Sequence, residues 1–259
     1  PTPVSVVLAG ILLKIGGYGL LRLALPLFPI EMTHFSGYLA FLGAFTIAYA
    51  AMNALAMSDL KKLIAYSSIS HMGFVTLGIA SHTVEGIHGA VYQMFSHGLI
   101  SSLLFILAGV LYDRTHDRAI ANYRGLANVM PKYAIFVAVA FFASLGLPGF
   151  SGFIAELFSL LGAYHAAMSG QFSVSFVVLA VIGILITGGY YVWTIQRMFM
   201  GKYSYKSSWT RSQLLHDITA REFSVQFLLV LLIILFGILP GLLMDKTGMT
   251  INALTELMK

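Results

Sequence analysis

Residues 133–168 read YAIFVAVAFFASLGLPGFSGFIAELFSLLGAYHAAM, and this stretch decides the fold. As one continuous helix its 36 residues would be about 54 Å long, whereas the hydrocarbon core of a bilayer is about 30 Å thick. The stretch is interrupted at residues 146–152, GLPGFSG, where Pro148 removes a helical hydrogen-bond donor and the glycines free the backbone. It therefore forms either two membrane spans or one span that is broken near its middle.

Six further apolar runs are each long enough to cross a membrane as a helix. They cover residues 4–25, 36–57, 62–81, 86–111, 172–198 and 223–244. Only 10% of the 259 residues are charged and 58% are hydrophobic, whereas soluble domains carry about 25% charged residues. We therefore predict an all-α, polytopic membrane helical bundle that forms a single transmembrane domain over residues 1–259, with a short interfacial helix over residues 246–259.

The distribution of Lys and Arg decides between two spans and one broken span, because cytoplasmic loops carry an excess of these residues. With one broken span, three loops on the same side hold eleven of the fifteen: Lys61, Lys62, Arg114, Arg118, Arg124, Lys132, Arg197, Lys202, Lys206, Arg211 and Arg221. The opposite side then holds three, Arg22, Lys246 and Lys259, and Lys14 lies within a span. With two separate spans, eight of these cations would lie on one side of the membrane and six on the other, which is hardly a bias. The sequence thus predicts seven spans, one of them broken, with residue 1 on the cytoplasmic side and residue 259 outside.

Composition also excludes several classes of function. The chain has no cysteine, so it forms no disulfide and ligates no iron–sulfur cluster. His82 and His165 are too dispersed to indicate a metal site, and we expect no metal and no cofactor in this chain. The net charge of +5 does not indicate nucleic acid, because the cations are scattered among apolar spans. The chain enters a span directly after Pro1-Thr2-Pro3 without a signal peptide, so we expect the later part of a longer chain.

Lys14 is the first of four ionisable residues that the pattern places inside the membrane. It follows ten residues of apolar span, which is too deep for its ammonium group to reach the near interface easily. Placing a charge at mid-bilayer costs about 2.5 to 3.5 kcal/mol on insertion scales, so each such residue is a candidate for function. Lys14 either exchanges a proton or pairs with a carboxylate from another helix.

His71 and His97 lie near the middle of consecutive predicted spans. His71 is ten residues beyond Lys61, about 15 Å along a helix, and His97 is flanked by Gln93 and Ser96. Histidine is the side chain whose unperturbed pKa permits proton shuttling near neutral pH. The alternative is a pair of neutral histidines that only hold helices together through hydrogen bonds.

Glu156 lies four residues after Gly152, close to the start of the second half of the broken span. Backbone donors and the helix dipole favour an anion at such a position. Broken helices in transporters place their half-helix ends at ion-handling sites near the midplane. Glu156 is therefore either a proton-carrying carboxylate or an acidic cap on a kinked helix.

Three stretches of the chain are similar to a known family. Leu8–Arg22 (LAGILLKIGGYGLLR), Asp59–Phe74 (DLKKLIAYSSISHMGF) and Gly146–Glu156 (GLPGFSGFIAE) resemble the antiporter-like membrane subunits of proton-pumping NADH:quinone oxidoreductase, respiratory complex I. The resemblance covers nearly the whole chain. It is strongest to the subunit M type, whose mitochondrial relative is NADH dehydrogenase subunit four, because sister subunits and Mrp-type sodium/proton antiporters usually have lysine where this chain has Glu156.

The resemblance implies fourteen spans with two inverted five-helix repeats, of which this chain would begin at the eighth. It implies that Lys14 links two half-channels, that His71 and His97 lie on a central hydrophilic axis, and that Glu156 is the terminal carboxylate of the second repeat. These four residues would transfer protons as part of a translocase in a bacterial inner membrane or an organellar inner membrane.

The partners that the resemblance implies are the lipid bilayer and the other membrane subunits of complex I. The resemblance also implies that the whole complex uses NADH, FMN, iron–sulfur clusters and quinone, none of them bound by this chain. Two alternatives stay open from the residues alone: a subunit of a multi-subunit Mrp-type sodium/proton antiporter, and a structural membrane subunit whose polar residues only join helices.

Overall fold

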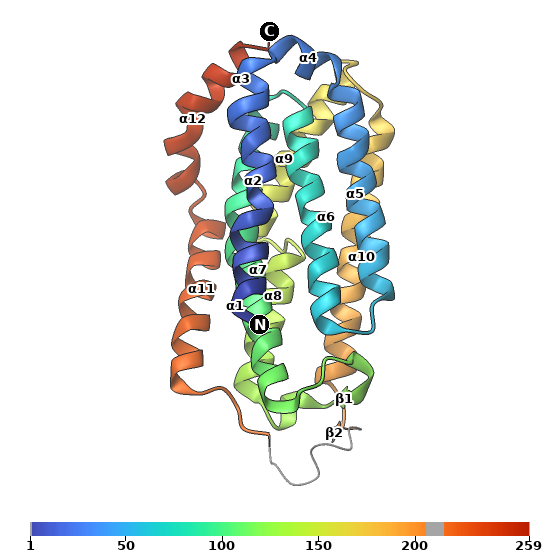
Figure 1. The fold of residues 1–259 in the computed structure, drawn as a ribbon, viewed down its shortest axis with the longest axis vertical. Coiled ribbons are helices and arrows are strands. Elements are labelled where there is room, and N and C mark those ends of the chain that lie inside the picture. Colours follow the sequence, from blue (N-terminus) through green and yellow to red (C-terminus); the bar gives the residue numbers. More distant parts are fainter. Residues whose placement is uncertain (1, 206–214, 259) are drawn as a thin grey trace.

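The break predicted within residues 133–168 is present in the structure. The computed structural model describes residues 2–205 and 215–258, and the stretch forms two helices, α8 (Pro131–Ser144) and α9 (Ser151–Met168), joined by a turn (Figure 1). Gly146 and Gly149 in that turn have φ angles of +74° and +97°, which L side chains avoid. Pro148 lies between them and cannot continue a helix. The backbone conformation of the turn therefore explains its two glycines and its proline.

Within residues 2–205 and 215–258, six other helices are long and apolar enough to cross a membrane. The first runs from Thr2 to Leu27 as α1 (Thr2–Val7), η1 (Leu8–Leu12), α2 (Leu13–Gly19), η2 (Leu20–Ala24) and α3 (Leu25–Leu27), where η1 and η2 are π-helical. The others are α5 (Ser36–Ala56), α6 (Leu60–Ala80), α7 (Val84–Thr115), α10 (Val174–Phe199) and α11 (Ala220–Ile238). The prediction of an all-α membrane bundle with one broken span is confirmed, and the chain is an integral, multi-pass membrane protein.

Short elements tie the loops of the lower end in Figure 1 together. They are η3 (Ile120–Asn122), β1 (Tyr123–Arg124), η4 (Leu126–Asn128) and β2 (Ser204–Tyr205). β1 pairs antiparallel with β2, and Asp59 forms an isolated bridge with Ala119. The three loops that carry most of the cations therefore meet at one end of the bundle. This agrees with a single crossing by the broken span, and the predicted loop cations Lys206 and Arg211, like Lys259, lie outside the described residues.

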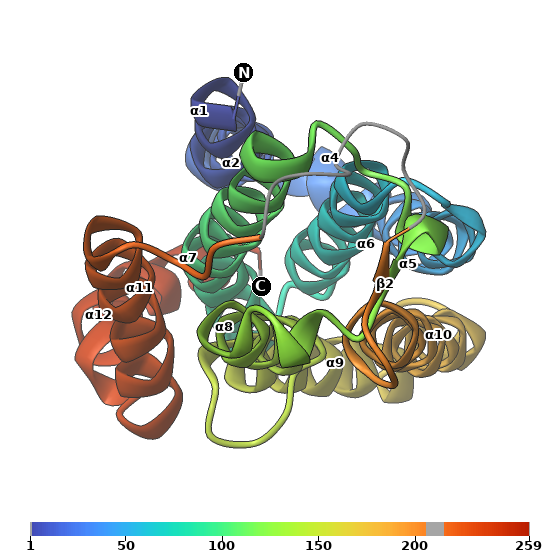
Figure 2. The ribbon, with the colours of Figure 1, turned by 90° about the horizontal axis from the view of Figure 1, so that it is seen from below.

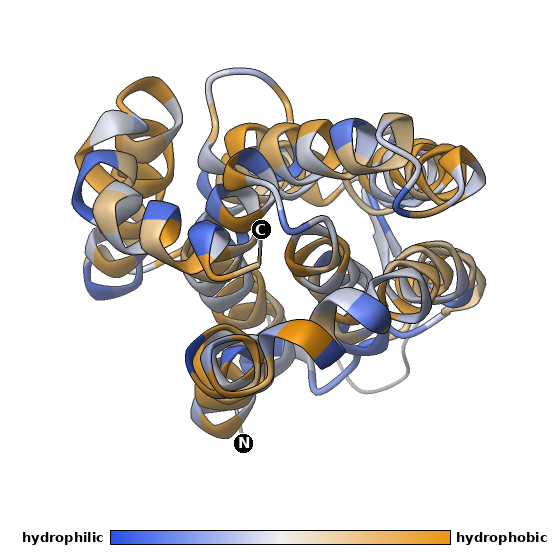
Figure 3. Ribbon diagram, turned by 90° about the horizontal axis from the view of Figure 1, so that it is seen from above, coloured by the Kyte–Doolittle hydropathy of each residue, from blue (hydrophilic) through white to orange (hydrophobic). Residues whose placement is uncertain are grey.

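α6 and α7 are the central helices, and the helix from Thr2 to Leu27 and α11 lie at the periphery (Figure 2). α5 and α6 approach closely at glycine, since a Cβ on Gly43 would lie 2.8 Å from the backbone nitrogen of Leu77. Seen from above, hydrophobic residues lie all round the perimeter of the bundle (Figure 3). Lipid-facing apolar surface of this kind leaves the interior as the only place for polar chemistry.

The last predicted span, residues 223–244, is shorter than expected. α11 ends at Ile238 because Pro240 removes a donor, and α12 (Gly241–Glu256) then begins. The short helix predicted over residues 246–259 is thus found as α12, with an earlier start. Ile251 of α12 packs in a buried cluster with Leu21 and Ile87, and at the top of the bundle α4 (Pro29–His34) joins the first span to α5 (Figure 1).

A bidentate ion pair joins the lower ends of α7 and α11. Arg114 donates to both carboxylate oxygens of Glu222, at 3.0 and 2.7 Å, and to the carbonyl of His216 at 2.9 Å. Asp217 then accepts from the first backbone amides of α8, at 2.9 and 3.1 Å. The arginine thereby fixes the segment that caps the broken span.

Arg114→Gln should lower the unfolding temperature of the detergent-solubilised protein by several degrees. A partly buried charged hydrogen-bond set of this kind contributes about 1 to 2 kcal/mol after allowance for solvent screening. The matched control is Arg221→Gln, an exposed arginine whose loss should change stability by less than about 0.5 kcal/mol. Equal shifts for the two variants would contradict a stabilising role for Arg114.

His82 lies in the turn between α6 and α7 with a φ angle of +53°. Its Nδ1 is 3.2 Å from Nε2 of Gln171, and its own Nε2 is buried and has no hydrogen-bond partner within residues 2–205 and 215–258. Burial lowers the pKa of His82 from 6.5 to about 4, because the protonated form loses its hydration.

Stability should therefore fall as pH is lowered from about 6.5 towards 4, since the unfolded chain then binds a proton that folded His82 does not. Above that range both states are neutral at this position and His82 has no effect. The loss is on the order of 3 kcal/mol at most. His82→Asn, which tolerates the left-handed backbone, should lose less stability between pH 7 and 4.5, measured as unfolding temperature at each pH.

Candidate functional site

The four ionisable residues predicted inside the membrane lie in one continuous row across four helices. Lys14 is on α2, His97 on α7, His71 on α6 and Glu156 on α9. Each is buried, with relative exposures of 9, 3, 4 and 6% respectively. Buried ionisable groups in a membrane bundle are retained at a cost in free energy, which makes this row the strongest candidate for function.

Lys14 is held by a histidine and a backbone carbonyl. Its Nζ is 2.7 Å from Nδ1 of His97 and donates to the carbonyl of Ala9. The π-helical segment η1 makes this acceptor available. In an α-helix the Leu13 amide would bond to the carbonyl of Ala9, but here it bonds to the carbonyl of Leu8, five residues back. Across the described part of the chain no carboxylate oxygen lies within 4 Å of Lys14, so the alternative of a carboxylate partner is not observed.

The hydrogen bond between Lys14 and His97 can hold its proton on either the lysine or the histidine. A lysine ammonium donates to a neutral His97 that carries its proton on Nε2, or a His97 imidazolium donates to a neutral lysine amine. Both states satisfy the same 2.7 Å distance between Nζ and Nδ1. Transfer along this bond therefore needs no movement of the helices.

His71 and Glu156 form the second pair of the row. Nδ1 of His71 is 3.2 Å from Oε1 of Glu156. The prediction that helix-terminal backbone donors hold Glu156 is wrong, because this residue is the sixth of α9 and the first turn of that helix holds no acidic residue. The carboxylate is held by a histidine on another helix instead.

A chain of hydroxyls contacts Nε2 of His71. This nitrogen is 3.1 Å from Oγ of Ser144, which in turn is 2.7 Å from the hydroxyl of Tyr191. Nδ1 of His71 lies near both Oε1 of Glu156, at 3.2 Å, and Nε2 of Gln93, at 3.3 Å. When Ser144 donates to Nε2, the neutral imidazole carries its proton on Nδ1 and can donate it to Glu156. Protonation of Nε2 reverses both hydroxyls without breaking a bond.

A small polar cavity separates the two pairs. The ring centroids of His71 and His97 are 5.4 Å apart, and the cavity beside them has a volume of about 10 Å³. One water requires about 10 to 15 Å³ and two or more polar partners. Gln93 also lines the cavity, and its Oε1 has no partner among residues 2–205 and 215–258, so it is available to such a water. A single water is enough to join the two histidines.

Ser144, Tyr191 and Gly146 are site residues that the sequence reasoning missed. Ser144 is the last residue before the break, and Tyr191 is the second of two consecutive tyrosines on α10. A Cβ on Gly146 would lie 2.7 Å from Oε2 of Glu156, so only glycine leaves room for the carboxylate. The sequence carries only a weak indication of these residues, namely a hydroxyl close before the break and a pair of tyrosines within an apolar span.

Ser144→Ala should slow proton transfer along the row several-fold and shift its pH profile, because His71 loses the hydroxyl that contacts its Nε2. Ser144 acts through His71 and is a positioning residue. Tyr191→Phe should have a similar effect, and the double variant should be no slower than either single variant, since both interrupt one chain. Additive losses would contradict a shared role, and the rates are measured as proton movement across vesicle membranes between pH 6 and 9.

The arrangement is suited to moving protons and offers little else. Within the described ranges no group of three or more His, Cys, Asp or Glu is placed to hold a metal ion. Four groups that can gain or lose a proton follow one another from α2 to α9, in two contacting pairs that share one small cavity. Broken helices beside buried ionisable groups are the arrangement that transporters use at ion-handling sites.

Comparison with known proteins identifies the family. Residues 1–187 match the family described as "NADH:quinone oxidoreductase/Mrp antiporter, TM", and the chain belongs to it. NADH-quinone oxidoreductase subunit M of Rickettsia felis is 43% identical over 256 residues, which cover 98% of this chain and 50% of that protein. The chain spans about half the length of the curated relatives it matches.

Two solved structures have a similar fold. A chain of respiratory complex I from Thermus thermophilus with bound NADH matches with a TM-score of 0.86 at 34% identity, over 95% of this chain and 50% of that one. A chain of the Mrp complex from Dietzia sp. DQ12-45-1b matches with a TM-score of 0.82 at 17% identity, over 94% and 52%. The second likeness shows a shared fold alone.

Proposed function

We propose that this chain translocates protons across the membrane as part of a subunit of the M type in NADH:quinone oxidoreductase. The observation that carries the proposal is the buried row of Lys14, His97, His71 and Glu156, in which successive groups are 2.7 to 3.2 Å apart or share one small cavity. Such a row conducts protons and excludes bulk water, as a pump requires.

Proton transfer along the row has a defined order. Lys14 gives a proton to Nδ1 of His97, and His97 gives one from Nε2 to the cavity water. The water gives a proton to Oγ of Ser144 as Ser144 passes its own proton to Nε2 of His71, and His71 releases the proton on Nδ1 to Glu156. One proton enters and one leaves, and each histidine then rotates or re-exchanges to its starting tautomer.

Charge coupling supplies the drive in this proposal. In a low-dielectric interior, two charges interact more strongly than in water, so a change of charge at one end alters the proton affinity of its neighbours. Electron transfer from NADH to quinone in other subunits would provide that change. We infer that the iron–sulfur clusters of the complex are ligated by other subunits, since this chain has no cysteine. NADH, FMN and quinone belong to the complex as a whole in this proposal.

The relatives favour the oxidoreductase over a sodium/proton antiporter. Relatives above 40% identity are named as subunits of NADH-quinone oxidoreductase, whereas the likeness to the Mrp complex is at 17% identity. Solved structures that include respiratory complex I from Thermus thermophilus and an archaeal respiratory membrane complex have a similar fold, which supports other membrane subunits as partners. Bacterial relatives support a bacterial inner membrane as the location.

Reconstituted complex in proteoliposomes tests the proposal. Addition of NADH and quinone should drive proton uptake or release, and an imposed sodium gradient without NADH should drive none. Proton movement driven by the sodium gradient alone would favour the antiporter. A third outcome, in which neutralised Glu156 prevents assembly while every assembled complex pumps at the full rate, would favour a structural subunit.

A further inference from the structure

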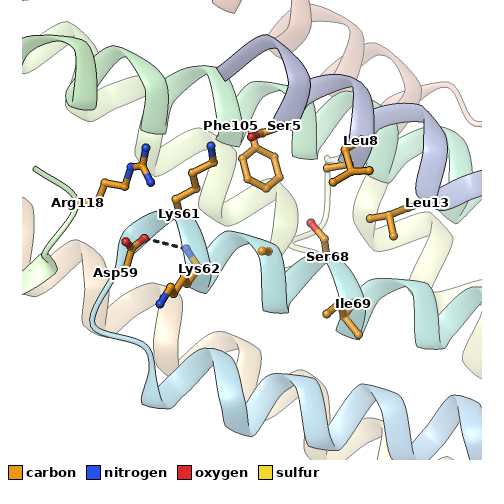
Figure 4. A pocket seen from close by; sticks show the side chains of 12 residues that line it. Ser5, Leu8, Leu13, Asp59, Lys61, Lys62, Ser68, Ile69, Phe105 and Arg118 are labelled. Carbon is orange, nitrogen blue, oxygen red and sulfur yellow. Dashed lines mark hydrogen bonds between the residues drawn. The ribbon is translucent and has the colours of Figure 1, made fainter. Parts of the chain in front are cut away.

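A groove of about 450 Å³ lies between the first span and α6 (Figure 4). Its walls come from α1, η1 and α2 on one side and α6 on the other, with Phe105 of α7 at its base. Leu8, Leu13 and Ile69 lie towards one end of the groove, and Asp59, Lys61 and Arg118 lie at the other (Figure 4). The groove thus combines an apolar trough with a charged rim.

The rim carries more positive than negative charge. Lys61, Lys62 and Arg118 face one carboxylate, that of Asp59, whose Oδ1 already accepts from the backbone amide of Lys62 at 3.0 Å. Among the residues that the structure describes, none of the three cations has a carboxylate oxygen within 4 Å. Lys61 and Arg118 are close enough to repel each other. The rim is therefore complementary to an anion.

We propose that the groove binds one anionic phospholipid, with its phosphate between Lys61 and Arg118 and one acyl chain in the trough. The rim lies at the end of the bundle where the cation-bearing loops meet, which is the level of a lipid headgroup. Basic residues beside an apolar trough at that level match the two parts of a phospholipid at once. A soluble anion would leave the trough uncovered.

The inner end of the groove reaches the proton row. Ala9 lines the groove, and its carbonyl accepts the hydrogen bond from the Lys14 ammonium. Leu13, beside Lys14 in sequence, lines it too. An acyl chain in the trough would cover the π-helical segment η1 and keep water from this side of Lys14. The lipid would therefore insulate the row as well as stabilise the helices.

Thermal unfolding of the delipidated, detergent-solubilised complex tests the charge requirement. Dioleoyl-phosphatidylglycerol should raise the unfolding temperature at lower concentration than dioleoyl-phosphatidylcholine, and inorganic phosphate should have no effect. In the Lys61→Gln, Arg118→Gln double variant the apparent affinity for phosphatidylglycerol should fall roughly 30-fold, which corresponds to two basic contacts of about 1 kcal/mol each. The matched control is Lys132→Gln, Lys202→Gln, which removes two exposed cations at the same end.

Ala65→Phe tests the trough without a change of charge. Ala65 is exposed and lines the groove, so the larger side chain fills the trough and leaves the helix packing intact. It should remove the stabilisation by phosphatidylglycerol, and native mass spectrometry should show one fewer retained anionic lipid. Equal effects of the two lipids, an unchanged response in both groove variants, or stabilisation by phosphate alone would overturn the proposal. So would failure of Ala65→Phe to assemble into the complex, because that result means protein occupies the groove.

Discussion

Glu156→Gln reduces NADH-driven proton uptake by at least about tenfold while the complex still assembles. The reason is chemical: glutamine retains an oxygen that accepts the hydrogen bond from Nδ1 of His71, but its amide cannot take up a proton near neutral pH. General acid–base groups that are removed in this way typically cost two to four orders of magnitude in the step they catalyse, and a tenfold loss is the lower bound if that step is partly rate-limiting. Uptake is measured in proteoliposomes against the amount of assembled complex.

The control for Glu156 is another glutamate on the same bundle. Glu85 lies in the first turn of α7 at the upper end of the bundle, is half-exposed, and has its Oε1 3.9 Å from Nδ1 of His165. Glu85→Gln should leave proton uptake within about twofold of the unaltered complex. Normal pumping by Glu156→Gln would show that the carboxylate is not on the proton path. Loss of assembly with full activity per assembled complex would show that its role is structural.

Lys14→Met and Lys14→Arg should be inactive to a similar degree, each at least about tenfold below the unaltered complex. Methionine removes the charge and the proton. Arginine keeps the charge, but its guanidinium group does not release a proton in proteins. The comparison separates two roles, because a lysine that only supplies positive charge to His97 would be replaced by arginine with little loss.

Lys202→Met is the control for Lys14, since Lys202 is exposed. Its loss should not change proton uptake by more than about twofold. Retained pumping by Lys14→Arg would contradict proton exchange at this residue and leave it an electrostatic role. An unfolding temperature within a few degrees of the unaltered complex is required of each variant before its activity is compared.

Much of the fold could be predicted because the membrane leaves few alternatives. Apolar run length identified the spans, and Pro148 with its flanking glycines identified the break. The end of α11 was misplaced because the run stays apolar through Leu242 and Leu243, so composition continues after Pro240 has ended the helix. Hydropathy measures solvent preference and does not register a missing amide donor.

The candidate site could be predicted in part for the same reason. A charge or an imidazole inside a span is costly, so Lys14, His71, His97 and Glu156 stand out from sequence alone. Ser144 and Tyr191 do not, because a hydroxyl in a helix can bond to its own backbone and costs little. The partner of Glu156 was also not predictable, since the long stretch of chain between it and His71 carries no signal of their contact.

The π-helical segment η1 has a consequence for how the first span tolerates change. A π turn takes one residue more than an α turn, so the residues before and after it are out of phase by about 100° relative to an uninterrupted α-helix. Thr2 meets Gly109 of α7 below the segment, and Lys14 meets His97 of the same helix above it. Both contacts with α7 can form only if the number of residues between Thr2 and Lys14 is kept. A single-residue deletion within Leu8–Leu12 would preserve every side chain of the site and still turn Lys14 away from it, so for this helix residue number, as much as residue type, encodes function.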